Sequence, residues 1–265
     1  MCHNKTMCHK KTMRHKKMGT STRGLALTLA LLFTLGCGSE EELTKPVSDS
    51  INTIMPLGAS RVEGFRPEFE SYRYELWKGL LADGWTFDFV GTRSDRGSYP
   101  PVDGLGFDVD HEGRGGWTSG LIRRDLAAWL ERTGAPDVVL FSSPGGNDAL
   151  ENLPFDETTS NISAIIDVLQ AANPEVTVIL ELMAPGRRDV MTPRVADYFD
   201  RLRAYMLVLS AEKTTGSSSV ITVDMYTGFT EAMLADDVHY NEAGADFIAQ
   251  RYRQVLAGVL QEDPE

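Results

Sequence analysis

The sequence predicts an α/β fold, a three-layer α/β/α sandwich built on a five-stranded parallel sheet. Three observations favour this fold. Five short segments rich in Val, Ile, Leu and Phe alternate with five longer segments of helical length and periodicity. Several of the short segments are continuously apolar, as strands are when helices cover both faces of a sheet. Polar, glycine-containing stretches follow several of them, at the edge where such sheets bind ligands.

Strands and helices are expected in alternation along residues 51–262, the predicted globular domain. The expected strands lie near 52–57, 86–90, 137–142, 176–182 and 219–224. The expected helices lie near 68–82, 118–132, 158–172, 194–213 and 241–260. Each expected strand precedes an expected helix, which is the βα repeat of a parallel sheet.

The composition suits one domain of about 200 residues behind an N-terminal appendage. The chain has 265 residues, 42% of them hydrophobic, and a net charge of −12. None of the 38 acidic residues lies in residues 1–36, so the rest of the chain is strongly acidic and is expected to repel nucleic acid. The three cysteines, Cys2, Cys8 and Cys37, all precede the predicted domain. Disulfides and cysteine-based zinc sites are therefore excluded from that domain.

Residues 1–18 form three six-residue near-repeats, which begin at Met1, Met7 and Met13. One interpretation is a metal-binding tail, with ligands drawn from Cys2, His3, Cys8, His9 and His15. We favour a low-complexity extension, or a start codon set too early with Met18 as the true start. The reason is that a complete export signal follows without these residues.

An export signal is expected after the repeats. Arg23 precedes the apolar run Leu25–Leu35, which is shorter than the ~20 residues needed to span a bilayer. The run ends in Gly36-Cys37, which resembles the lipobox of a bacterial lipoprotein, although Thr34 stands where leucine is usual. We expect residues 1–36 to hold a lipoprotein-type signal peptide and Cys37 to become lipidated. The alternative is an ordinary cleaved signal and a secreted protein.

Residues 37–50 are polar and acidic and are expected to form a flexible tether. The protein is then expected to be exported and held to a membrane by its lipid anchor, on the extracytoplasmic side. We expect it to be a monomer that meets an acylated carbohydrate or another small ester.

Ser60 is the candidate nucleophile. The apolar run that ends in Gly58-Ala59-Ser60 is typical of a buried strand that delivers one hydroxyl to the edge of a sheet. The alternative is that Ser60 only caps the helix that follows it.

Asp236 and His239 lie three residues apart, just before the last expected helix. A tight turn can bring such a carboxylate against the imidazole, where it would orient the ring and stabilise its cation. Asp237 is the local rival for that role. The alternative is that the acids or Asn241 only cap the helix and that His239 is an exposed loop residue.

Two further positions could bind a developing oxyanion. Asn147 follows the expected strand 137–142, and a side-chain amide there can donate to the oxyanion. Gly116 precedes the expected helix at 118, and glycine lets its backbone N–H approach a ligand closely. The alternatives are a plain turn around Asn147 and a flexible glycine loop with Trp117 as a packing residue.

The stretch before Gly116 is rich in acidic residues. They are Asp103, Asp108, Asp110 and Glu112, and His111 lies among them. A calcium site is conceivable. Because a recognisable ligand-spacing loop is absent, we expect a solvated acidic loop and no metal site.

These stretches resemble the SGNH hydrolases of the GDSL esterase superfamily, whose four blocks supply Ser, Gly, Asn and His. The similarity is greatest to the acetylxylan esterases of carbohydrate esterase family three. The matching stretches are Ile54–Ser60, Tyr72–Gly84, Phe87–Gly91, His111–Thr118 and Asp237–Gly244. The resemblance covers roughly residues 51–257 and implies a flavodoxin-like sandwich.

The resemblance also implies roles. Ser60 would be the nucleophile, His239 the base and Asp236 its orienting carboxylate. The N–H groups of Ser60 and Gly116 and the Asn147 amide would form the oxyanion hole. No metal or organic cofactor is implied.

The sequence departs from the family pattern at two places. Ala59 stands where Gly-Asp-Ser has its aspartate, so a carboxylate that normally braces the site is gone. Asp237 and Tyr240 replace the glycine and proline of the usual Asp-Gly-Val-His-Pro, which could alter the turn that carries His239.

We expect a serine esterase that hydrolyses O-acyl, chiefly O-acetyl, esters on polysaccharide. Within enzymes the alternative is a lipid-directed esterase, a lysophospholipase or thioesterase, but the sequence shows no long apolar lid. The alternative from another class is a non-catalytic, glycan-binding surface lipoprotein. Ala59 favours that alternative, whereas the joint presence of Ser60, Asn147, Asp236 and His239 argues against it.

Overall fold

The computed structural model describes residues 46–262. The expected signal peptide, Cys37 and most of the expected tether lie outside the described residues. Among the residues that are described, no helix combines the length and the apolarity needed to cross a membrane.

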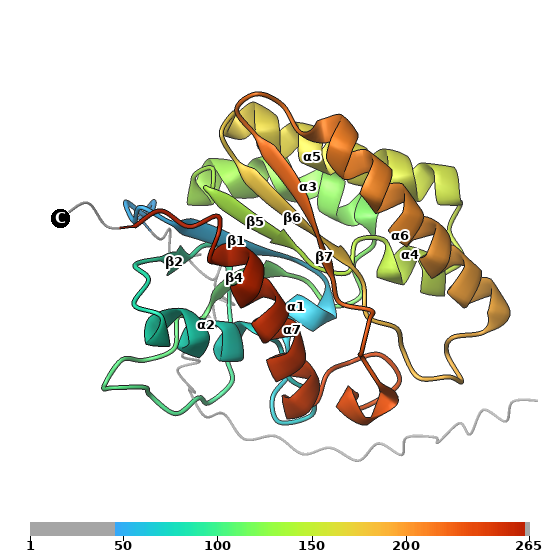
Figure 1. Cartoon of the computed structure of the whole chain (residues 1–265), viewed down its shortest axis with the longest axis horizontal. Coiled ribbons are helices and arrows are strands. Elements are labelled where there is room, and N and C mark those ends of the chain that lie inside the picture. Colours follow the sequence, from blue (N-terminus) through green and yellow to red (C-terminus); the bar gives the residue numbers. More distant parts are fainter. Residues whose placement is uncertain (1–45, 263–265) are drawn as a thin grey trace, which may run out of the picture. The chain divides into compact units, whose positions relative to one another are not determined.

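A mostly parallel sheet forms the middle layer of the domain (Figure 1). Its centre is β1 (Thr53–Gly58), which pairs in parallel with β5 (Val138–Phe141). Next come β6 (Thr177–Leu182) and β7 (Ser219–Asp224), again parallel. The carboxyl ends of these strands therefore lie along one edge of the sheet.

Three shorter strands lie on the other side of β1. The start of β1 pairs with β2 (Asp88–Phe89) and its end pairs with β4 (Asp110–Gly113), both in parallel. The strand β3 (Arg93–Ser94) runs antiparallel to β4. The predicted layered α/β fold is confirmed, and the five expected strands correspond to β1, β2, β5, β6 and β7. The sheet also contains β3 and β4, which were not predicted. They have only two and four residues and carry no apolar run that a sequence pattern could detect.

The acidic stretch before Gly116 is not the solvated loop that we expected. His111 and Glu112 belong to β4 and are 1% and 0% exposed. Glu112 accepts hydrogen bonds from the N–H and the Oγ1 of Thr92, at 2.8 and 2.7 Å. Asp108 accepts a hydrogen bond from the Phe89 N–H at 2.6 Å. Partners about 20 residues away in the chain thus engage the later part of this stretch, whereas Asp103 stays exposed. The pattern of acidic residues alone does not reveal these partners.

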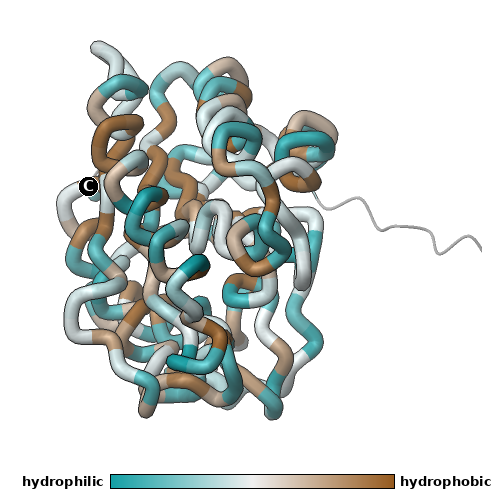
Figure 2. The backbone as a smooth tube through the Cα atoms, turned by 90° about the vertical axis from the view of Figure 1, so that its right-hand side faces the viewer, coloured by the Kyte–Doolittle hydropathy of each residue, from teal (hydrophilic) through white to brown (hydrophobic). Residues whose placement is uncertain are grey.

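Helices cover both faces of the sheet (Figure 1). One face carries α3 (Ser119–Thr133), α5 (Phe155–Ala172) and α6 (Pro193–Lys213), and the other carries α2 (Arg73–Ala82) and α7 (Glu242–Leu256). Each of the five corresponds to an expected helix, although α2 begins later and α7 ends earlier than predicted. Most helical turns of the tube in Figure 2 carry both hydrophilic and hydrophobic stretches, because one side of each helix meets the sheet.

Side chains on alternate positions of the strands pack into two separate hydrophobic cores, one on each face of the sheet. In β1, Met55 and Leu57 pack with α3, α5 and α6, whereas Ile54 packs with α2 and α7. Such alternation follows from the two-residue period of a strand. A rigid sheet buried on both sides holds the loops at its carboxyl edge in defined positions.

Two short helices follow strands at that edge. The helix α1 (Ser60–Glu63) begins directly after β1, and α4 (Gly146–Leu150) begins shortly after β5. The sequence pattern predicted neither α4 nor the shortness of α1. Together they carry two of the candidate site residues, Ser60 and Asn147.

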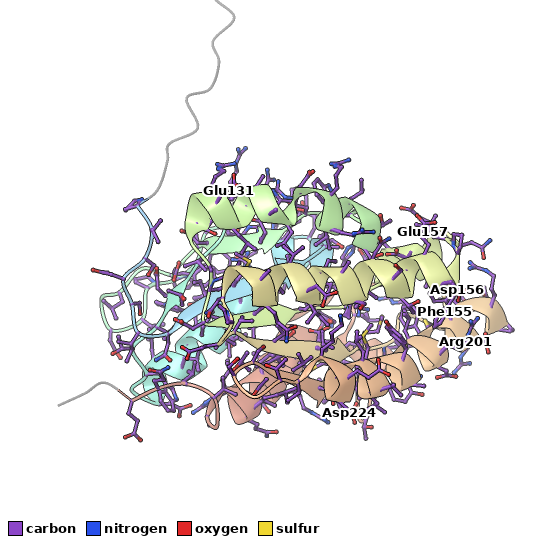
Figure 3. The ribbon with its side chains drawn as sticks, turned by 90° about the horizontal axis from the view of Figure 1, so that it is seen from above. Glu131, Phe155, Asp156, Glu157, Arg201 and Asp224 are labelled. Carbon is purple, nitrogen blue, oxygen red and sulfur yellow. The ribbon has the colours of Figure 1, made fainter. Side chains whose placement is uncertain are left out.

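The start of α5 and the middle of α6 meet near α4. The Arg201 guanidinium lies over the Phe155 ring, 3.8 Å from its centroid. Figure 3 shows Phe155, Asp156, Glu157 and Arg201 close together. Asp156 and Glu157 occupy the first turn of α5, where the helix dipole favours negative charge. These contacts hold the helices against which α4 packs.

Candidate active site

Ser60, His239 and Asp236 form a hydrogen-bonded chain. His239 Nε2 lies 2.8 Å from Ser60 Oγ, and His239 Nδ1 lies 2.7 Å from Asp236 Oδ2. Ser60 is the first residue of α1, just after β1, whereas the other two come from the loop before α7. An imidazole in this geometry can take the proton of a hydroxyl, while the carboxylate orients it and stabilises its cation.

The turn that carries His239 is built by Asp236 itself. Asp236 Oδ1 accepts hydrogen bonds from the backbone N–H groups of Val238 and His239, at 2.9 and 2.8 Å. Burial acts to raise the pKa of Asp236. The hydrogen bonds from the His239 ring and from the two N–H groups outweigh burial, so the pKa lies below its ordinary value. Asp236 is therefore a carboxylate at neutral pH.

Asp237, the local rival, does not face the imidazole. Its side chain is exposed and makes no hydrogen bond with any residue in the described range 46–262, while its backbone carbonyl accepts from the Arg187 N–H at 2.8 Å. The structure thus brings Asp236 rather than Asp237 to the ring.

Phe69 covers one face of the imidazole. The two rings stack with centroids 3.8 Å apart and planes 12° apart. The next residue, Glu70, donates its N–H to the Tyr240 carbonyl at 2.8 Å, which ties this segment to the histidine loop. An aromatic face both limits the ring's rotation and attracts its cation. Phe69 is not predictable from the sequence, since nothing local relates residue 69 to residue 239.

The turn from β1 into α1 places the Ser60 hydroxyl. Gly58 is packed so closely that a Cβ there would lie 2.8 Å from the Ser142 carbonyl oxygen. Only glycine permits that approach. The N–H groups of Val62 and Glu63 donate to the Ala59 carbonyl and close the first turn of α1.

Three residues that carry candidate N–H donors line the same cleft. Ser60, Gly116 and Asn147 all line one cleft with His239. Within residues 46–262 the backbone N–H groups of Ser60 and Gly116 have no acceptor. Asn147 Nδ2 donates to the Trp117 carbonyl at 2.8 Å, which leaves its second N–H for another acceptor. This set could stabilise an oxyanion that forms beside Ser60.

Carboxylates from other segments hold these loops. Glu63 Oε2 accepts a hydrogen bond from the Gly115 N–H at 2.6 Å. The buried Asp148 accepts from the N–H and the hydroxyl of Ser119, at 2.9 and 2.5 Å, which joins the Asn147 helix to the start of α3, shortly after Gly116. Although Ala59 removes one carboxylate from the usual pattern, Glu63 and Asp148 brace the two donor loops from elsewhere.

Arg61 links the two halves of the site. It is 8% exposed and donates to the carbonyls of Val238 and Ala184, both at 2.8 Å, and of Pro185 at 3.2 Å. Its Nη1 also lies 3.3 Å from Ser143 Oγ. Arg61 therefore joins α1 to the histidine loop, the loop after β6 and the segment before Asn147.

A buried glutamate lies behind Ser143. Glu181 is fully buried and accepts from the Ser143 N–H at 2.7 Å, from Ser142 Oγ at 2.8 Å and from the Tyr252 hydroxyl at 2.7 Å. Burial raises the pKa of its carboxyl. Glu181 is not predictable as part of the site, because an acidic residue within an apolar strand gives no local sign of its partners.

Two cavities meet at Ser60. The larger, about 690 Å³, is an open cleft that also includes Gly116, Asn147, His239 and several charged residues of the 63–97 region. The smaller, about 40 Å³, shares Ser60, Asn147 and Val238 with the cleft. Its remaining lining is mostly apolar and comes from the turn between β1 and α1, the segment from Ser143 into α4, the loop after β6, and α6.

The acidic stretch before Gly116 does not gather into a metal site. Within residues 46–262, no three His, Cys, Asp or Glu side chains lie close enough to hold a metal ion. Asp108 and Glu112 are engaged by N–H groups and hydroxyls as described above, and His111 Nδ1 accepts from the Gly113 N–H at 3.0 Å.

Comparison with known proteins points to esterases. The sequence model of the GDSL-like lipase/acylhydrolase family matches residues 57–247. A family 3 carbohydrate esterase from Talaromyces cellulolyticus has 29% sequence identity and a TM-score of 0.66, covering 78% of this chain and 97% of that one. An acetyl esterase crystallised with acetate gives the same values. A family 3 carbohydrate esterase from Clostridium thermocellum has 28% identity and a TM-score of 0.62, covering 79% and 99%. Among curated proteins, none matches the chain significantly.

Proposed function

Because the chain belongs to the GDSL-like lipase/acylhydrolase family and is a carboxylic ester hydrolase, we propose that it works through Ser60, His239 and Asp236 on O-acetyl esters of polysaccharide. The single observation that supports the catalytic part is the hydrogen-bonded chain from Ser60 Oγ through the imidazole to Asp236. A purely binding protein has no need of that arrangement.

The first half of the reaction acylates Ser60. Ser60 Oγ attacks the carbonyl carbon while its proton passes to His239 Nε2. The carbonyl oxygen becomes an oxyanion, which the N–H groups of Ser60, Gly116 and Asn147 stabilise. The bond from carbon to the alcohol oxygen then breaks, and that oxygen takes the proton from His239.

The second half removes the acyl group. A water molecule attacks the acyl carbon and gives its proton to His239 Nε2. The bond to Ser60 Oγ breaks, the proton returns to that oxygen, and the carboxylic acid leaves. Asp236 stays ionised throughout and stabilises the imidazolium in both halves. Its lowered pKa suits this role.

The carbohydrate part of the proposal rests on the cleft and on the similar structures. The cleft is wide and open and carries charged residues, and Phe65 on its rim is 63% exposed. An exposed ring beside a polar groove suits the apolar face of a sugar better than a buried acyl chain. The two similar proteins named as carbohydrate esterases and the acetyl esterase point the same way.

Acetate release from acetylated xylan and from p-nitrophenyl acetate tests the proposal, with Ser60→Ala as the matched variant. We expect turnover of both substrates by the parent protein and none by Ser60→Ala. Activity that survives in a folded Ser60→Ala protein would contradict the catalytic assignment. Ser60-dependent hydrolysis of the nitrophenyl ester without release from xylan would contradict the polysaccharide assignment alone.

We also propose that Cys37 is lipidated after removal of residues 1–36. The support is the sequence of Arg23, the apolar run and Gly36-Cys37. Labelling with a fatty acid in a bacterial host tests it: label is expected on the parent chain and none on Cys37→Ser. Equal labelling of both would overturn the proposal.

A further inference from the structure

We propose that the small cavity beside Ser60 is an acyl pocket that takes saturated acyl groups up to butyryl, and not acetyl alone. This inference rests on the proposed function of the same site. It concerns the acid part of the ester, whereas the cleft receives the alcohol part.

The position of His239 decides which cavity receives which part of the ester. The leaving alcohol oxygen takes its proton from His239 Nε2, so the alcohol lies on the side of His239. His239 and Gly116 line the large cleft and are absent from the lining of the small cavity. Ser60 and Asn147 line both, so the acyl carbon lies where the two cavities meet. The acyl substituent, which points away from the alcohol, then enters the small cavity.

The lining of the small cavity suits a hydrocarbon. Apolar side chains make up most of it: Leu150, Met183, Val190, Met191, Phe199 and Val238. Arg61 also lines it, but its nitrogens already donate to three backbone carbonyls. The guanidinium therefore does not select for a charged acyl group. Because thioethers adapt their shape easily, Met183 and Met191 allow a methyl or a short chain to pack.

The size of the cavity sets the limit on chain length. A volume of about 40 Å³ holds roughly three water-sized groups, at about 10–15 Å³ for each. An acetyl group places only its methyl beyond the carbonyl carbon, whereas butyryl places three carbons there. A hexanoyl chain would need two more and finds Phe199 of α6 in the lining.

Ala59 also lines this cavity. An aspartate at that position, as in the family pattern that the sequence resembles, would bring a charged carboxyl to an apolar wall. The alanine keeps the wall apolar and leaves its space to the acyl chain.

The test is a series of p-nitrophenyl esters from acetate to octanoate, with rates corrected for the hydroxide-catalysed rate of each ester. We expect kcat/KM to rise about fourfold for each methylene up to butyrate, as for burial of one CH₂, and to fall at least tenfold by octanoate. A maximum at acetate with a decline already at propionate would overturn the proposal. A continued rise to octanoate would also overturn it and would indicate a lipid ester.

Val190→Phe and Val208→Phe form a matched pair of variants. Val190 lines the cavity, whereas Val208 lies on the outer side of α6 and is 55% exposed. We expect Val190→Phe to shift the maximum to acetate and Val208→Phe to leave the series unchanged. Met191→Ala, which enlarges the cavity, is expected to move the maximum beyond butyrate. If all three variants are folded and show the parent series, the cavity does not hold the acyl group.

Failure of this inference differs from failure of the proposed function. If no ester is hydrolysed in a Ser60-dependent manner, the proposed function fails. If hydrolysis depends on Ser60 but the chain-length series does not respond to the Val190 and Met191 variants, only the acyl pocket fails.

Discussion

The two sides of the site are held in different ways. On the base side, Asp236 accepts hydrogen bonds from the N–H groups of Val238 and His239 and contacts the His239 ring, and its side chain is 51% exposed. On the donor side, Glu63 holds Gly115 from 52 residues away and Asp148 holds Ser119 from 29 residues away. The first arrangement is local and exposed to solvent. The second is long-range, exposed where Glu63 meets Gly115 and buried where Asp148 meets Ser119.

Because of this difference, we expect the two sides of the site to contribute differently to the reaction rate and to the stability of the fold. A local turn at the surface contributes little to the free energy of unfolding, because water replaces its bonds readily when they break. A buried carboxylate that accepts several hydrogen bonds is costly to remove, because its donors are left without partners. Substitutions on the base side should therefore affect rate, and those on the donor side should affect stability or both.

The largest effect is expected from Asp236→Asn. The amide still accepts from the backbone at Oδ1, but its Nδ2 faces His239 Nδ1 and disfavours the tautomer that can take a proton from Ser60. We expect kcat to fall about 10⁴-fold, as for the corresponding change in a serine protease triad, with the melting temperature nearly unchanged. Steady-state kinetics and a thermal melt check both.

The neighbouring Asp237→Asn is the matched control, since it removes the same charge one residue away. It should keep the parent rate. Equal losses in the two variants would show that general electrostatics, and not contact with the imidazole, sets the rate.

Asp148→Ala should cost the most stability. It removes the acceptor for the N–H and hydroxyl of Ser119 and for Thr158 Oγ1, all inside the protein. We expect a loss of about 3 kcal/mol in the free energy of unfolding, measured by urea titration. Asp156→Ala, an exposed aspartate in the first turn of α5, should cost less than about 1 kcal/mol. A loss for Asp148→Ala no larger than that control would break the contrast between the two sides.

Glu63→Leu tests whether a long-range contact can act on rate. It keeps similar bulk but removes the acceptor for the Gly115 N–H, so the Gly116 donor is no longer held. We expect kcat to fall about 10²-fold, the lower end for loss of one oxyanion donor, with little change in KM. Arg93→Leu removes the other partner of Glu63 and should have a small effect. A rise in KM with kcat unchanged would argue against a role at the oxyanion.

The smallest expected effect is a pH dependence of stability. Burial raises the pKa of Asp108, which precedes β4, to about 7, whereas the pKa of Asp236 is lowered. The contribution of Asp108 to the free energy of unfolding is thus complete below about pH 4, the pKa of an aspartate in the unfolded chain. It is lost as pH rises through 7. That of Asp236 is present above about pH 4 and is lost only in more acidic solution.

Between pH 5 and 8 we therefore expect the free energy of unfolding of the parent protein, measured by urea titration, to fall by about 1–2 kcal/mol. Asp108→Asn should flatten this decline, and the exposed Asp103→Asn should leave it in place. Identical profiles for the parent and Asp108→Asn would show that another group controls the pH dependence.

Several features were predictable from the sequence because they depend on neighbours in the chain. The alternation of apolar strands and amphipathic helices predicts the layered fold, since each element shows its own period. The three-residue spacing of Asp236 and His239 suggests their contact, since one turn closes it. Ser60 and Asn147 are placed at the same edge because parallel strands end there.

Other features depend on segments that only folding brings together. The sequence favoured Asp236 and kept Asp237 as a rival, and only the turn shows which carboxylate is directed at the ring. The burial of Glu112, the stacking of Phe69 on His239 and the hold of Glu63 on Gly115 join residues that are 20 to 170 positions apart. The small cavity that we propose as an acyl pocket has the same origin, because its walls come from five separate segments. The sequence thus determined the sheet and the placing of the reactive groups at its edge, whereas tertiary packing decided how those groups are oriented, braced and given room.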